Sequence, residues 1–76
     1  MPRYFFHIHH GVRNADENGE DLPDNDAAWK EATITAGRLL QDLDGTLKPD
    51  LEWRMEVTDE AGNIIWVLRL LAEKHR

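Results

Sequence analysis

The first residues of the chain alternate in a way typical of a β-strand. Residues 3–9 read RYFFHIH, a run rich in aromatic and β-branched side chains, and Gly11 follows as a turn residue. Successive side chains of a strand point to opposite faces of its sheet. One face should therefore carry Tyr4, Phe6 and Ile8, and the other Phe5, His7 and His9.

A polar, strongly acidic segment follows, and it leads into a helix. Residues 20–22 are expected to form a short second strand, which Pro23 ends because proline cannot donate to a sheet. Carboxylate and amide side chains at residues 24–26 suit a helix N-terminus. Small and apolar residues then recur at helical spacing, so this helix should pack closely on a sheet. The predicted buried stripe comprises Ala28, Ala32, Thr35, Ala36, Leu39 and Leu43.

The C-terminal third is predicted to be a β-hairpin. Residues 52–58, EWRMEVT, alternate between polar and apolar. The turn DEAGN places Gly62 where a hairpin needs a residue with positive φ. The returning segment, IIWVLRLL, is apolar on both faces except for Arg69.

The order β-β-α-β-β predicts one α+β domain over residues 1–76, with an antiparallel sheet of three to four strands and one helix on one face. A single helix shields one face only, so the other face of the last strand should carry an apolar strip. We expect this strip to be an interface, most simply between two copies in a homodimer. The alternative is that the acidic loop or the C-terminal tail covers it. The expected interface residues are Phe5, Ile65, Val67 and Leu71.

Length and composition change this picture in two ways. A chain of 76 residues without cysteine has a small core and no disulfide, so self-association is an economical extra source of stability. The net charge of −6 makes nucleic acid an unlikely partner, because nucleic-acid affinity depends on phosphate neutralisation.

No apolar run approaches the roughly 18 residues of a membrane span, and the N-terminus lacks a signal-peptide layout. We expect a cytoplasmic protein.

Three histidines in the first strand raise the question of a metal site. His7 and His9 lie two residues apart, so their rings point the same way and could chelate zinc, copper or nickel. A third ligand would have to come from the same face, and whether His10 takes part is left open. The alternative is that these histidines are ordinary polar residues on an exposed strand face. The available third ligands are Glu52, Glu56 and His75.

Other chemistry has little support. Asn14, Asp16, Asn18 and Gly19 match the first positions of a calcium loop, but position 12 of that loop is Asn25 instead of glutamate. A solvated turn before the helix is the better interpretation. The chain has no serine, no cysteine and no glycine-rich phosphate loop. We therefore expect neither an enzyme nor a bound cofactor.

Three segments taken together resemble a family of short bacterial domains of unknown function, DUF6894. They are MPRYFFHIHHG, ADENGEDLPDNDAAWKEA and RMEVTDEAGNIIWVL. The resemblance implies an architecture and no particular activity. We expect a non-enzymatic interaction or structural module that self-associates. The alternatives are a metal-binding or metal-sensing domain that uses His7 and His9, and a regulator that contacts a protein or nucleic-acid partner.

Overall fold

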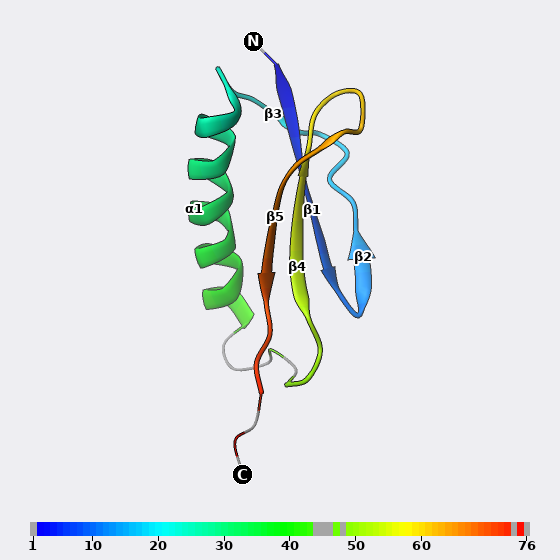
Figure 1. Cartoon of the computed structure of the whole chain (residues 1–76), viewed down its shortest axis with the longest axis vertical. Helices are drawn as coiled ribbons and strands as arrows, with labels where there is room; N and C mark the ends of the chain where they lie inside the picture. The colour runs from blue at the N-terminus through cyan, green and yellow to red at the C-terminus, as the bar shows by residue number, and fades with distance from the viewer. Residues whose placement is uncertain (1, 44–46, 48, 74, 76) are drawn as a thin grey trace.

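One helix packs against one face of an antiparallel sheet in the computed structural model, which describes residues 2–43, 47, 49–73 and 75 (Figure 1). Four of the strands run in the order β2-β1-β4-β5, and β3 pairs with β1. The predicted α+β class is confirmed, and β2 is a strand that the sequence did not predict. The elements are β1 (Arg3–His10), β2 (Val12–Asn14), β3 (Glu20–Asp21), α1 (Asn25–Leu43), β4 (Trp53–Thr58) and β5 (Ile64–Leu70).

The pairing of β1 with β4 forms the centre of the sheet. Phe6 lies opposite Val57, and Ile8 lies opposite Met55. Because opposite residues share a face, the apolar positions of both strands point to the helix. The predicted alternation of β1 is therefore confirmed.

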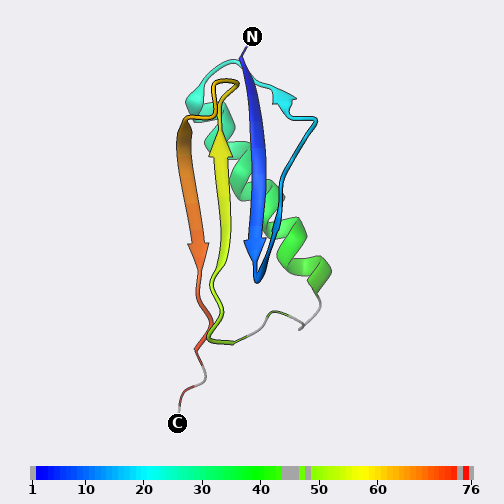
Figure 2. The same cartoon turned by 90° about the vertical axis from the view of Figure 1, so that its right-hand side faces the viewer.

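The core lies between the sheet and three alanines of α1. Small side chains at one helical spacing let the helix axis approach the strands closely, so large side chains from the sheet fill the layer. Figure 2 shows that α1 begins behind the start of β5 and crosses the sheet diagonally towards the far end of β1. The buried hydrophobic residues are Tyr4, Ala28, Ala32, Ala36, Trp53, Met55 and Val57.

The start of α1 is fixed to two strands by hydrogen bonds. The Ala27 N–H donates to Oδ1 of Asp24 at 2.8 Å, which is an N-cap bond. The Tyr4 hydroxyl of β1 donates to Oδ1 of Asn25 at 2.7 Å. Nε1 of Trp66 in β5 donates to the Asn25 carbonyl at 2.8 Å. These bonds set where the helix begins its path across the sheet.

A β-bulge at the start of β5 changes which face of the sheet the side chains there point to. Val57 pairs with Trp66, but Thr58 pairs with Ile64, so Ile65 is an extra residue. Ile65 is half-buried and packs against the core cluster. The prediction that it lies on the face away from the helix is therefore wrong, because strict alternation fails at the bulge.

Within the described residues, no helix is both long enough and apolar enough to cross a lipid bilayer.

The close approach of α1 can be tested by enlarging one of its alanines. Ala32 has no exposed surface, so Ala32→Leu forces the helix away from the sheet and should lower the free energy of unfolding by about 1–3 kcal/mol. Gln41→Leu, at an exposed position of the same helix, is the control and should leave stability nearly unchanged. Urea denaturation followed by circular dichroism measures both; equal stabilities would contradict the packing described.

Candidate functional site

The sheet face away from the helix carries the polar chemistry of the molecule. Alternation along β1 places Phe5, His7 and His9 there, and the register sets His7 opposite Glu56 and His9 opposite Arg54. His7 and His9 therefore lie on the same face of the sheet, as predicted. The contacts of each imidazole ring determine which chemical role that histidine can have.

Both ring nitrogens of His7 are engaged. Nδ1 accepts a hydrogen bond from the Asp16 N–H at 3.0 Å, and Nε2 lies 3.0 Å from Oγ1 of Thr58. An accepting Nδ1 requires the neutral ring with its hydrogen on Nε2, which donates to Thr58. Burial lowers the pKa of His7, and the nearby Arg13 guanidinium lowers it further. His7 is therefore a neutral structural contact between a loop and two strands.

Asp16 completes the attachment of the acidic loop to β1. Its Oδ2 accepts the Phe6 N–H at 3.2 Å, and its Oδ1 accepts the N–H groups of Asn18 at 3.1 Å and Gly19 at 3.2 Å. Burial alone would raise the pKa of Asp16, but these backbone donors and His7 outweigh it, so the pKa lies below its usual value. The carboxylate is committed to backbone N–H groups, which supports a structural turn over a calcium loop.

The loop also covers Phe5. Gly19 has φ +71°, and a Cβ placed on it would lie 2.9 Å from Cε1 of Phe5 and 2.9 Å from the Tyr4 carbonyl oxygen. On its other side, the Phe5 ring stacks on the His7 ring at 6.3 Å between centroids. Phe5, an expected interface residue, is therefore half-buried beneath the chain's own loop.

Glu56 is the centre of an ion-pair network beside His7. Its carboxylate lies 3.2 Å from Nε2 of His9, 3.8 Å from Nη1 of Arg13 and 3.6 Å from Nε of Arg54. Its side chain is only 15% exposed, so three positively charged or titratable groups surround a mostly sheltered carboxylate. The negative charge of Glu56 is therefore balanced by the guanidinium groups of Arg13 and Arg54.

These contacts bear on the metal-site hypothesis. A metal ion at His7 would have to displace the loop or Thr58, and Nε2 of His9 already faces Glu56. Over residues 2–43, 47, 49–73 and 75, no three histidine or carboxylate side chains form a group that could hold a metal ion. His75 and Glu52 thus do not complete such a site with the two histidines.

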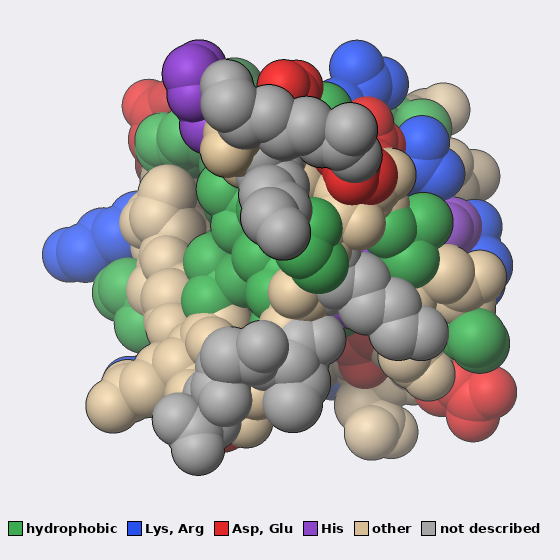
Figure 3. Space-filling model, turned by 90° about the horizontal axis from the view of Figure 1, so that it is seen from below, with side chains coloured by type: hydrophobic (Ala, Val, Ile, Leu, Met, Phe, Trp, Pro, Cys, Tyr) green, Lys and Arg blue, Asp and Glu red, His purple; other side chains and the backbone are tan. Residues whose placement is uncertain are grey.

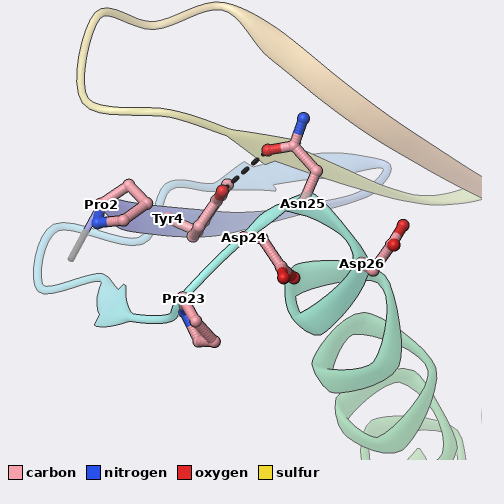
Figure 4. A pocket seen from close by; sticks show the side chains of 6 residues that line it. All are labelled: Pro2, Tyr4, Pro23, Asp24, Asn25 and Asp26. Carbon is pink, nitrogen blue, oxygen red and sulfur yellow. Dashed lines mark hydrogen bonds between the residues drawn. The ribbon is translucent and has the colours of Figure 1, made fainter.

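Two hollows flank the helix. The first, of 430 Å³, lies at the start of α1, where the Tyr4–Asn25 hydrogen bond crosses between its walls (Figure 4). The second, of 410 Å³, lies at the other end, where hydrophobic side chains gather between helix and sheet in the view from below (Figure 3). Neither lining contains a serine, threonine, cysteine or lysine. The first is lined by Pro2, Tyr4, Pro23, Asp24, Asn25 and Asp26, and the second by Ile8, His10, Asn14, Leu39, Asp42, Leu43 and Trp53.

Exposed apolar side chains gather instead along the β5 edge of the sheet. Of the expected interface residues, Val67 is 37% exposed and Leu71 is 54% exposed. Ile64 and Leu70, which the sequence did not single out, are 57% and 37% exposed, and Trp29 at the start of α1 is 38% exposed. β5 is the last strand in the order β2-β1-β4-β5, and strand order cannot be obtained from the alternation of one chain.

Residues 3–72 match the profile of a family described as domain of unknown function DUF6894. The chain belongs to this family. The DUF6894 match spans every strand and the helix, so the architecture described above is that of the matched region. No curated protein matches the chain, and no solved structure matches it.

Alanine variants of two glycines with positive φ distinguish the cost of a steric clash in the loop from the cost of backbone strain. Gly62→Ala, with φ +84° and nothing within 4 Å of the added Cβ, should cost about 1–2 kcal/mol of unfolding free energy from conformation alone. Gly19→Ala adds a collision with Phe5 and the Tyr4 carbonyl and should cost distinctly more. Denaturant unfolding of both variants measures the difference, and equal costs would contradict the close seating of the loop.

The His7 contact predicts a pH dependence of stability. The folded pKa of His7 lies below its usual value of 6.5, so its contribution is fully present above that value and is lost as pH falls through the folded pKa. The free energy of unfolding should therefore decrease on acidification below about pH 6.5. His7→Gln should flatten this decrease, whereas His75→Gln, at an exposed position, should not. An identical profile in His7→Gln would exclude the proposed protonation state.

Proposed function

We propose that this DUF6894 domain is a non-enzymatic interaction module that forms a homodimer through the edge of strand β5. The observation that carries the proposal is the position of β5: it pairs with β4 and ends the sheet, so within the described residues its outer edge has no neighbouring strand. An exposed edge presents backbone N–H and C=O groups that a further strand can bind.

The side chains of β5 favour such pairing. Ile64, Val67 and Leu70 are exposed hydrophobic residues, and Leu71 continues the series. Protein edges are usually protected by charged residues, proline or short strands. β5 spans seven residues with Arg69 as its one charged member and no proline. Its edge is therefore long and apolar.

The opposite edge of the sheet is different. β2 has three residues and β3 has two, and these short strands divide the outer side of β1 between them. Their side chains are mostly polar or charged, with Arg13, Glu20 and Asp21 among them. Short strands and charged side chains thus protect that edge, which favours the edge of β5 as the partner surface among the described strands.

Association also suits the small core. Seven hydrophobic residues are buried among those that the structure describes, and domains of about this chain's 76 residues are marginally stable alone. Burial of the β5 side chains against a second copy adds apolar area to that core. The polar groups of the open face support no competing catalytic role, because His7 and Glu56 are held by neighbours within the fold.

A charge on β5 tests the proposal. Val67→Asp should convert a dimer of twice the 8.8 kDa chain mass into a monomer, because the carboxylate would be desolvated at the interface. Ile34→Asp is the control: Ile34 is 39% exposed, close to the 37% of Val67, but lies on α1. Light scattering across a concentration series gives the masses, and circular dichroism checks folding. Wild-type protein that is monomeric at every concentration would refute the proposal.

A further inference from the structure

We infer that two copies join their β5 strands antiparallel about a two-fold axis at Val67, and that Trp29 of each copy covers the far end of the other copy's β5. This inference rests on the proposed function and specifies its geometry. It predicts a continuous sheet across the dimer with both helices on the same face. Three features of the β5 edge lead to it.

Alternation of side chains limits where the axis can lie. In an antiparallel pair, directly opposite residues share a face, so a symmetric pairing that keeps the helix faces together must be centred on a residue. Val67 is the midpoint of Ile64–Leu70. An axis there brings the two strands together along their length, with residues 66–68 at the centre and the bulge at Ile65 toward either end.

The single charge of β5 favours the same register. An axis at Arg69 would set two guanidinium groups directly opposite each other, which is destabilising. An axis at Leu68 would leave them two positions apart, or about 7 Å along the strand. An axis at Val67 separates them by four positions, about 14 Å, and places Val67 against its counterpart.

The diagonal path of the helix leaves a gap that the second copy fills. α1 begins behind the start of β5 and leaves the far end of that strand uncovered (Figure 2), where Leu70 is 37% exposed. In the Val67-centred register, Trp66 lies beside Leu68 of the second copy and diagonal to its Leu70.

Trp29 is placed to close this gap. Its ring packs on Trp66 with 5.1 Å between centroids, yet it remains 38% exposed. Since Trp66 adjoins the second copy's Leu68, the exposed part of Trp29 covers the uncovered end of that copy's β5. Contact between Trp29 of one copy and the β5 end of the other thus explains why both Trp29 and Leu70 are exposed in a single chain. Aromatic residues are also frequent interface anchors.

Cysteine cross-linking tests the register, because the chain has no cysteine of its own. Residues directly opposite in an antiparallel pair have Cα atoms about 4.5–5.5 Å apart, within the disulfide range. Val67→Cys should form an intermolecular disulfide on mild oxidation. Arg69→Cys, the control on the same strand, should form none, since its two copies lie too far apart. Non-reducing electrophoresis reads both.

The outcomes separate the inference from the proposed function. If light scattering shows a dimer but Val67→Cys does not cross-link, or Arg69→Cys does, the register is wrong and β5 association survives. If the wild type is monomeric, both fail. Dimerisation of Trp29→Ala should weaken by about tenfold or more, with Ile34→Ala unchanged. An unchanged dissociation constant for Trp29→Ala would overturn the role of Trp29.

Discussion

The close packing of three helix alanines on one face of the sheet is the contact on which the rest of this structure depends. Ala28, Ala32 and Ala36 let one helix cover the large side chains of the central strands. A single helix can shield only one face of a sheet. The open face and the two edges of the sheet must therefore be protected from solvent by other means.

The open face is protected by the chain's own polar groups. Over β1, the loop is held by Asp16 and by the neutral ring of His7, and it shelters Phe5. On β4, the carboxylate of Glu56 lies within 4 Å of His9, Arg13 and Arg54. Histidines that would suggest a metal site by spacing instead fix a loop, in the case of His7, and lie against the Glu56 carboxylate, in the case of His9. Among the residues that the structure describes, no strand or loop contact of this kind protects the outer edge of β5, which is why the proposed association is placed there.

Local pattern was enough to predict most of the fold. Alternation in residues 3–9, helical spacing of the alanines and the turn at Gly62 identified the main elements and most of the core. β2 was missed because three residues are too few to show a period. Ile65 was placed on the wrong face because a bulge depends on how a hairpin closes, which alternation does not encode.

The candidate site was harder to predict. The acidic segment was expected to be a turn, but its contact with His7 depends on the path of a loop and on backbone donors that sequence does not reveal. Likewise, the exposure of Leu70 follows from strand order and from the diagonal helix. Both are properties of the assembled sheet, not of any one segment.

Amide hydrogen exchange along β5, measured at several protein concentrations, tests the central claim most directly. If the uncovered edge is completed by a second copy, the β5 amides that point away from β4 should exchange slowly in concentrated protein and quickly after dilution. Exchange of those amides that is fast and independent of concentration would contradict the account.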